Sequence, residues 1–128
     1  MNAASRPVVL VAVSPNGLDQ SLVRQVLLGL EEESVPAEVV EWEQGRTAEE
    51  LAHEAAARSP LGVGVGIGKD AWVVVHHRRL RKSSPLFRVH GRTCPADMVR
   101  DAGHNAARLV KGVPFKWSEY GEPVCRGG

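Results

Sequence analysis

Three consecutive glutamates, Glu31, Glu32 and Glu33, close a segment whose apolar residues repeat at helical spacing. The carboxyl end of a helix is electronegative, so each carboxylate there costs about 0.3–1 kcal/mol, and adjacent carboxylates repel each other. Such a conflict with local preference often marks a functional site. A hard divalent cation or a basic partner surface would compensate these charges. A solvated acidic turn that tolerates the cost is the alternative, and the charges alone leave both open.

The five histidines of the chain supply no catalytic arrangement. His76 and His77 are adjacent in a predicted strand, so their side chains point to opposite faces and cannot chelate one ion. The sequence contains no HExxH motif, no nucleophile elbow and no spaced carboxylate pair. We therefore expect a non-catalytic chain in which each histidine is structural or exposed. The other three are His53, His90 and His104.

The stretch Leu61–Gly68 alternates a branched apolar residue with glycine at every step. In an extended strand, one face would carry all the apolar side chains and the other face would carry none. Glycine weakens a strand and usually marks the close approach of another backbone. We predict that a helix packs on this bare face; a ligand or a partner chain is the alternative. The glycines are Gly62, Gly64, Gly66 and Gly68.

These glycines do not form a nucleotide-binding motif. Read from Gly62 or Gly64, the third glycine of GxGxxG would fall on Ile67 or Lys69. The segment before Asp70 also lacks the first glycine of a phosphate loop, and Asp70 stands where that loop needs Ser or Thr. We expect this chain by itself to bind no nucleotide.

The composition is that of one globular domain. The chain has 128 residues, of which 43% are apolar and 24% charged, and its formal net charge is +1. This balance, with 5% aromatic residues, argues against a nucleic-acid binder. The first apolar run, Val8–Val13, is too short for a signal peptide or a membrane span. Two cysteines, Cys94 and Cys125, form neither a disulfide framework nor a metal-site spacing, so we expect a cytoplasmic protein.

Hydrophobic periodicity predicts the elements that must position the glutamates. The run Val8–Val13 is typical of a strand buried on both faces. A helix is expected from about Leu18 to Glu33, with Asp19 near its start. Ala37–Trp42 follows as a short second strand. The apolar stripe of the helix comprises Leu22, Val23, Val26, Leu27 and Leu30.

A second helix begins at a capping box, in which Thr47 is the N-cap and Glu50 bonds back to it. Pro60 ends this helix. Because its apolar face is rich in alanine, it can approach a sheet closely, and we expect it on the glycine face described above. That alanine-rich face comprises Leu51, Ala52, Ala55 and Ala56.

The link Lys69–Asp70 is too short for a crossover, so the glycine strand and the next strand, Ala71–His76, must form an antiparallel hairpin. A basic loop and a short strand, Pro85–His90, come next. The last helix starts near Cys94-Pro95 and ends at Gly112, which suits a left-handed cap. Its expected apolar stripe is Met98, Ala102, Ala106 and Leu109, and the basic loop carries Arg78, Arg79, Arg81 and Lys82.

The predicted order is therefore β-α-β-α-β-β-β-α. This order indicates an α/β fold: a single layered domain over residues 1–128, with a mostly parallel sheet and one antiparallel hairpin. Residues 116–128, after Phe115, are expected to form a loose tail.

Four stretches of the chain together resemble one known family, the small subunit of the reactivating factor for adenosylcobalamin-dependent diol and glycerol dehydratases. The similarity extends from the first strand to Phe115. The last of the four motifs is the most specific, because it is the longest. The stretches are Leu28–Pro36, Ala56–Leu61 running into Val63–Val65, Pro85–Phe87 and Asn105–Phe115.

The resemblance implies a fold like part of the dehydratase medium subunit. It also implies two partners, a large chaperone-like ATPase subunit and the dehydratase itself. In this family the complex releases damaged cobalamin from inactivated dehydratase by exchanging subunits. Nucleotide and cobalamin would then be bound elsewhere than on this chain. The resemblance further suggests a cytoplasmic location near a metabolic microcompartment.

The resemblance also implies a role for the acidic helix end. In the family, a glutamate of the Gly-(Leu/Ile)-Glu-Glu motif contributes to a divalent cation site at the contact with the large subunit. The matching residue is Glu32, with Glu31 as its neighbour. The expected metal site is thus a Mg²⁺ or Ca²⁺ ion at the subunit interface.

Two other assignments remain open. The first is a shortened medium subunit of the dehydratase itself. Such a subunit is expected to carry an additional N-terminal region, whereas Val8 already lies in the first predicted strand, so the reactivating factor is favoured. The second is a nucleic-acid-binding module that uses the basic loop, which is richer in charge than the family leads us to expect. We expect neither nucleic acid nor a membrane as a partner.

Overall fold

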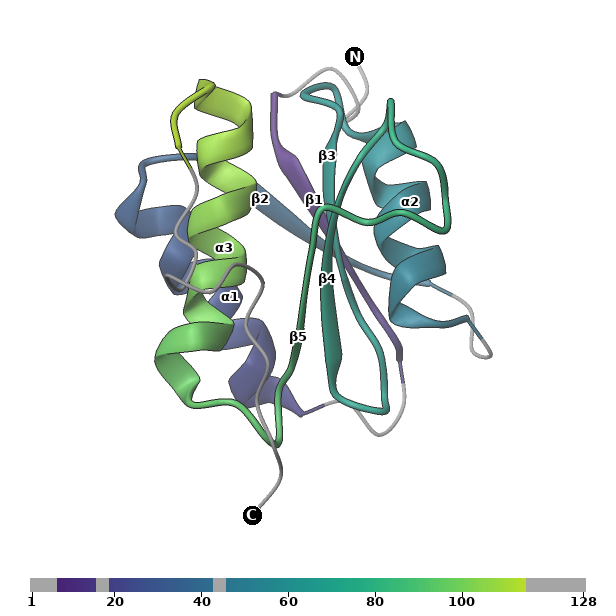
Figure 1. Ribbon diagram of the computed structural model, residues 1–128, viewed down its shortest axis with the longest axis vertical. Coiled ribbons are helices and arrows are strands. Elements are labelled where there is room, and N and C mark those ends of the chain that lie inside the picture. Colours follow the sequence, from purple (N-terminus) through teal and green to yellow (C-terminus); the bar gives the residue numbers. More distant parts are fainter. Residues whose placement is uncertain (1–6, 16–18, 43–45, 115–128) are drawn as a thin grey trace.

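The computed structural model describes residues 7–15, 19–42 and 46–114, which form eight elements in the predicted order. Figure 1 shows them as a sheet with helices packed against it. The strands are β1 (Val9–Val13), β2 (Ala37–Glu41), β3 (Val63–Ile67), β4 (Trp72–His77) and β5 (Phe87–His90). The helices are α1 (Gln20–Glu32), α2 (Ala48–Arg58) and α3 (Ala96–Lys111).

The five strands of the described residues form one mixed sheet in the order β2-β1-β3-β4-β5. Strand β1 pairs in parallel with β2 and with β3, whereas β4 runs antiparallel to both β3 and β5. The predicted hairpin between β3 and β4 is confirmed. The prediction of one antiparallel hairpin is incomplete, however, because β5 adds a second antiparallel pairing.

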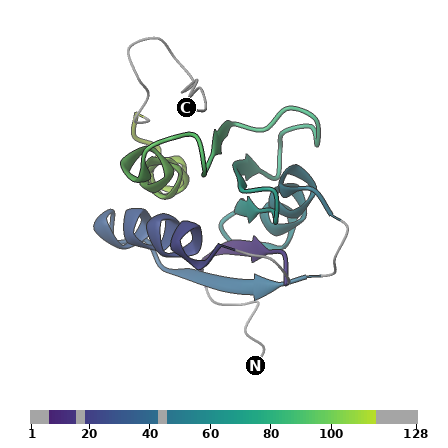
Figure 2. The ribbon, with the colours of Figure 1, turned by 90° about the horizontal axis from the view of Figure 1, so that it is seen from below.

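The sheet is covered on both faces, as Figure 2 shows from below. Helices α1 and α3 lie side by side on one face, and α2 lies on the other. The face under α1 and α3 holds the main core, in which Val11, Val65 and Phe87 are almost fully buried. This arrangement confirms the layered α/β prediction and leaves β2 and β5 as the edge strands.

Helix α2 lies directly on the glycine face of β3, as the sequence predicts. A methyl group added at Gly64 would come within 2.6 Å of the Ala52 carbonyl oxygen. One added at Gly66 would collide with the backbone of Ala48. The helix backbone occupies the space that side chains would need, and so the bare face of β3 holds neither a ligand nor a partner.

Glycines also bring α1 and α3 together. A methyl group at Gly29 of α1 would lie 2.8 Å from the backbone nitrogen of His104. One at Gly103 of α3 would lie 3.0 Å from the backbone nitrogen of Leu30. Each helix thus presents a glycine to the backbone of the other, and the two axes approach closely. This contact decides what surrounds the C-terminal end of α1.

The helix ends follow local rules. Asp19 caps α1 by accepting the Ser21 backbone N–H at 2.9 Å, and this hydrogen bond to the Ser21 hydroxyl and backbone lowers the Asp19 pKa. The predicted capping box of Thr47 and Glu50 opens α2. Gly112 ends α3 with φ 71°, in the left-handed conformation expected for it.

Three details of the prediction change. Pro95 is the N-cap of α3 rather than its first helical residue. The buried face of α3 is centred on Gly103, so Met98 and Leu109 lie at its margin instead of within the stripe. The predicted start of α1 at Leu18 and the expected loose tail at 116–128 lie outside the described residues.

Candidate interaction site

The three glutamates at the end of α1 meet a basic stripe on α3. Glu33, the C-cap residue of α1, accepts a hydrogen bond from Arg108 Nε at 2.9 Å. It accepts another from Lys111 Nζ at 2.8 Å, and the same ammonium donates to the Glu33 carbonyl oxygen at 3.0 Å. The Glu33 side chain is only 14% exposed, so these charge-assisted bonds are partly shielded from water.

This clamp determines the protonation of Glu33. Hydrogen bonds from Lys111 and then Arg108 hold the pKa of the Glu33 carboxyl at about 2, well below its ordinary value of 4.5. The carboxylate is therefore ionised at any physiological pH. It joins the end of α1 to the end of α3 across 75 to 78 residues of sequence.

Glu32 also faces α3, but it is more open to solvent. Its Oε1 atom lies 2.6 Å from Nε2 of His104, and its Oε2 atom lies 3.9 Å from Nη1 of Arg100. The other ring nitrogen of His104, Nδ1, lies 2.9 Å from Oδ1 of Asp101. The Glu32 side chain is 50% exposed, whereas that of His104 is 8% exposed. One side of the Glu32 carboxylate is thus tied to α3, and the other side faces solvent.

Glu31 differs from both neighbours, because it is exposed and has no ion pair with any described residue. The structure thus gives Glu32 and Glu33 intramolecular partners. This third way of compensating the charges was missing from the sequence-based alternatives. Only Glu31 presents an uncompensated carboxylate at this helix end.

The sequence did contain a signal for the basic stripe. Arg100, His104, Arg108 and Lys111 are spaced by four, four and three residues, which places them on one face of a helix. Nothing in that spacing says which surface they meet. The glycine pair Gly29 and Gly103 would have been the clue that α1 lies beside this face.

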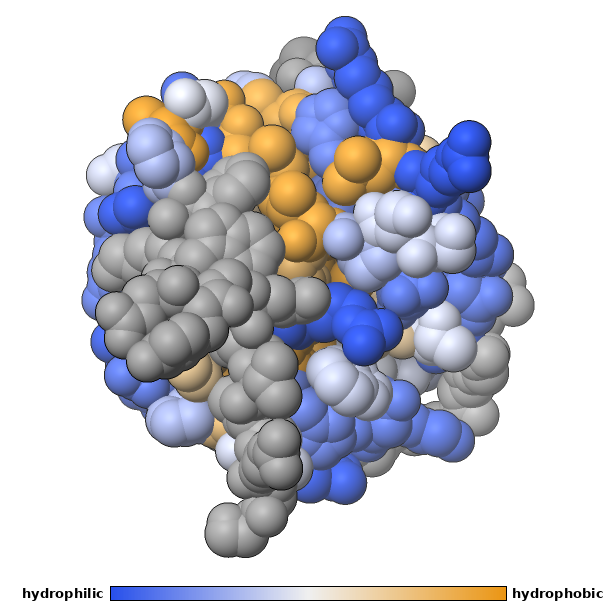
Figure 3. All heavy atoms as spheres, in the orientation of Figure 1, coloured by the Kyte–Doolittle hydropathy of each residue, from blue (hydrophilic) through white to orange (hydrophobic). Residues whose placement is uncertain are grey.

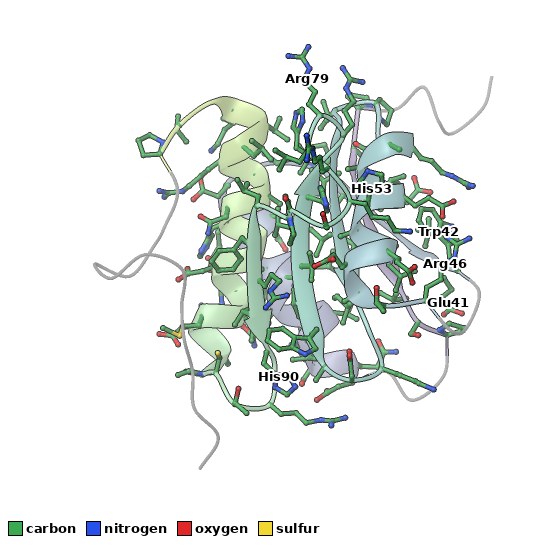
Figure 4. All side chains as sticks on the ribbon, turned by 45° about the vertical axis from the view of Figure 1, so that its right-hand side comes forward. Glu41, Trp42, Arg46, His53, Arg79 and His90 are labelled. Carbon is green, nitrogen blue, oxygen red and sulfur yellow. The ribbon has the colours of Figure 1, made fainter. Side chains whose placement is uncertain are left out.

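The histidines take structural positions, as expected. His76 is fully buried; its Nε2 lies 3.2 Å from the Lys82 carbonyl oxygen, and its ring meets that of His53 edge-on at 5.0 Å between centroids. Burial lowers the pKa of His77, and the neighbouring Arg79 and Arg78 lower it further. His90 contacts the Trp72 ring, again edge-on. Figure 4 shows His53 and His90 far apart, on α2 and at the end of β5.

The basic loop lies at the end of β4. Arg78, Arg79 and Arg81 are exposed, and Figure 4 shows Arg79 pointing away from the body of the molecule. Lys82 lies 3.4 Å from Glu50 of α2. The Arg78 side chain also covers Gly62, whose φ is 73°. The loop is therefore in part tied to the fold rather than presented whole to solvent.

The described surface offers shallow hollows rather than a deep cleft. In Figure 3, a band of hydrophobic residues runs down the middle of one face, with hydrophilic residues beside it. Partly buried apolar residues that border the core include Leu61, Leu86 and Val110. Two large apolar side chains among the described residues are markedly exposed, Val39 at 40% and Val113 at 41%.

Two further searches cover residues 7–15, 19–42 and 46–114 only. No three His, Cys, Asp or Glu side chains come together there in a way that could hold a metal ion. None of the helices in these ranges combines the length and apolar character that a membrane crossing requires.

Comparison with known proteins gives consistent matches. The family model described as dehydratase medium subunit matches residues 6–116. The diol dehydratase-reactivating factor small subunit of Klebsiella michiganensis is 42% identical over 113 residues, which cover 88% of this chain and 86% of that protein.

Two solved structures are similar in fold and sequence. A chain from a structure titled as glycerol dehydratase reactivase superposes with a TM-score of 0.83 at 32% identity, covering 87% of this chain and 97% of that one. A chain from a structure of diol dehydratase-reactivating factor complexed with ADP and Mg²⁺ superposes with a TM-score of 0.78 at 39% identity. That match covers 88% of this chain and 99% of the other.

Proposed function

The chain belongs to the dehydratase medium-subunit family, and from this membership we propose that it is the small subunit of a reactivating factor for a cobalamin-dependent diol or glycerol dehydratase. The observation that carries the proposal is the match along almost the whole length of solved reactivase chains. The fold supports a docking role. The glycine strand, where a ligand was the alternative, is filled by α2, and the histidines lie in separate structural contacts.

The proposed mechanism is subunit exchange. The chain pairs with a large ATPase-like subunit, which binds and hydrolyses the nucleotide. Because the chain has the fold of the dehydratase medium-subunit family, it can take the place of that subunit in an inactivated dehydratase. Displacement of the medium subunit opens the cobalamin site, so the damaged cofactor leaves and intact coenzyme can bind. The chain itself contributes a complementary surface and no reacting group.

The test is release of cobalamin. Purified dehydratase is loaded with a cobalamin that lacks the adenosyl group, then incubated with ATP, Mg²⁺, the large subunit and this chain. We expect free cobalamin in the ultrafiltrate only when both reactivase chains are present. Release by the large subunit alone would contradict the proposal. Copurification of this chain with the dehydratase large and small subunits and with retained cobalamin would instead favour the second candidate, a shortened medium subunit, which the family description suggests.

We further propose that Glu32 contributes to a Mg²⁺ or Ca²⁺ site at the contact with the large subunit. The half-exposed carboxylate fits one ligand of such an ion, since hard cations take six or more oxygen ligands and prefer carboxylates. The described residues gather no further ligand set around it, so the partner subunit would have to supply most of the others. A bound cation would also relieve the repulsion between Glu31 and Glu32.

Replacing Glu32 tests this site. We expect Glu32→Ala to weaken binding of the large subunit at least tenfold when Mg²⁺ is present, and chelation of the ion to weaken the wild type but not the variant. Binding is measured by titration of the two purified subunits. Glu38→Ala on the edge strand is the matched control, and it should behave as the wild type. Equal affinities of wild type and Glu32→Ala, with and without chelator, would contradict the metal proposal.

A further inference from the structure

Edge strand β2 leaves an apolar surface beside the end of α1. Residue Val39 pairs with Val11 of β1, and cross-strand partners share a face of the sheet. Val11 is fully buried beneath the helices, whereas Val39 is 40% exposed. The helices therefore cover β1 but leave the middle of β2 open. Ala37, Val39 and Glu41 line this face at alternate positions.

A hollow continues this surface at the N-terminal end of β2. Its volume is about 410 Å³, and its lining includes Leu27, Glu31, Pro36 and Ala37. Pro36 is exposed, and Leu27 and Ala37 are half-buried. We name the surface formed by Leu27, Glu31, Pro36, Ala37, Val39 and Glu41 the α1–β2 strip.

Carboxylates stand at both ends of the strip. Glu31 borders the hollow, and Glu41 lies at the far end of β2, where Figure 4 shows it at the outer edge of the molecule. Both are exposed, and neither has an ion pair within the described part of the chain. Ala37 and Glu41 are four residues apart, or roughly 13 Å along an extended strand. The strip is thus an apolar surface with an uncompensated negative charge at each end.

This charge pattern disfavours a second copy of the chain as occupant. Antiparallel pairing of two β2 edges about Val39 and Val40 would set Glu38 of each copy opposite Glu41 of the other. Like charges directly opposite each other are destabilising. A partner with an apolar group flanked by basic side chains would satisfy the strip instead.

We propose that the α1–β2 strip is the docking surface for the large partner subunit, which presents an apolar group against Val39 and cations against Glu31 and Glu41. This inference rests on the proposed function, because it takes the partner from it. It adds the part of the interface that supplies apolar contact. Glu32, next to Glu31 on α1, then lies at the border of the same contact.

The test compares two equally exposed valines. Val39→Glu places a charge in the middle of the strip, and Val113→Glu does the same after α3, outside the strip. Affinity for the purified large subunit is measured by titration. We expect Val39→Glu to bind at least tenfold more weakly than the wild type, because a carboxylate would be buried without a partner. Val113→Glu should bind as the wild type does.

Charge reversal gives a second readout. Glu31→Lys should weaken binding in low salt, and the loss should shrink as the salt concentration rises, because screening removes the repulsion. Urea unfolding of each variant establishes that it is folded. Val39 and Glu31 are exposed, so neither substitution is expected to change stability by more than about 0.5 kcal/mol.

The outcomes separate the two proposals. A wild-type chain that fails to bind the large subunit overturns the proposed function and this inference with it. A wild type that binds, with Val39→Glu unaffected or Val113→Glu weakened as much, overturns the strip alone. A wild type that is dimeric in solution and becomes monomeric in Val39→Glu would assign the strip to contact between copies, which also overturns it.

Discussion

Replacing Glu33 by glutamine tests whether the clamp between α1 and α3 stabilises the fold. Glutamine keeps the size of the side chain and one acceptor oxygen, but it removes the charge that Arg108 and Lys111 bind. The Glu33 pKa of about 2, against the ordinary 4.5, corresponds to a stabilisation of at most roughly 3 kcal/mol. Lys111 is 40% exposed, so screening by water reduces this value. We expect Glu33→Gln to lose about 1–2 kcal/mol of unfolding free energy at pH 7.

The pH dependence of this loss gives the sharper measurement. A carboxyl group whose pKa is lowered by folding stabilises the folded state above its unfolded pKa. Its contribution falls as the pH drops from 4.5 towards 2, where the folded carboxylate also takes up a proton. Urea unfolding of wild type and Glu33→Gln should therefore differ at pH 7 and converge towards pH 2. Salt at 1 M should reduce the difference at pH 7.

Glu31→Gln is the matched control, because it removes a neighbouring charge that has no ion pair among the described residues. It should be neutral or slightly stabilising, since it takes a negative charge away from a helix C-terminus. The reasoning is refuted if Glu33→Gln and Glu31→Gln are equally stable at pH 7. It is also refuted if the loss in Glu33→Gln persists unchanged at pH 2.

Two glycine substitutions test the close contacts of the helices. Gly66→Ala should cost about 1–3 kcal/mol or more, because the new methyl group meets the α2 backbone at Ala48, which cannot rotate away. Gly68→Ala, whose methyl meets the movable Asp70 side chain, should cost less in the same urea unfolding experiment. Gly103→Ala should likewise cost about 1–3 kcal/mol by pushing α3 from α1, and Glu33→Gln should then cost less in that background than in the wild type. Additive losses would show that the helix contact does not position the clamp.

The position of α2 could be predicted from the sequence because two local patterns agree. Alternating glycines leave one face of β3 bare, and an alanine-rich helix begins at a capping box shortly before it. Small surfaces of this kind have few other ways to pack. The same holds for the hairpin after β3, since a link of a few residues permits no crossover.

The surroundings of the glutamates could not be predicted in this way. The sequence shows that Glu31, Glu32 and Glu33 crowd a helix end, and it shows a basic stripe on a later helix. It does not show that the two surfaces meet, because the partners are 72 to 78 residues apart. Their meeting depends on both helices lying on the same face of the sheet, and on Gly29 and Gly103 allowing them to touch.

The sequence by itself thus determined the elements, their caps and the family, since these depend on residues close together in the chain or on motifs that can be read directly. Only the tertiary structure decided which of the three glutamates remains uncompensated. Glu33 and Glu32 are neutralised by α3, while Glu31 faces outward beside the open face of β2. The physical reason is that the energy of a charge depends on what is packed around it, and packing between distant segments leaves no local pattern in the sequence.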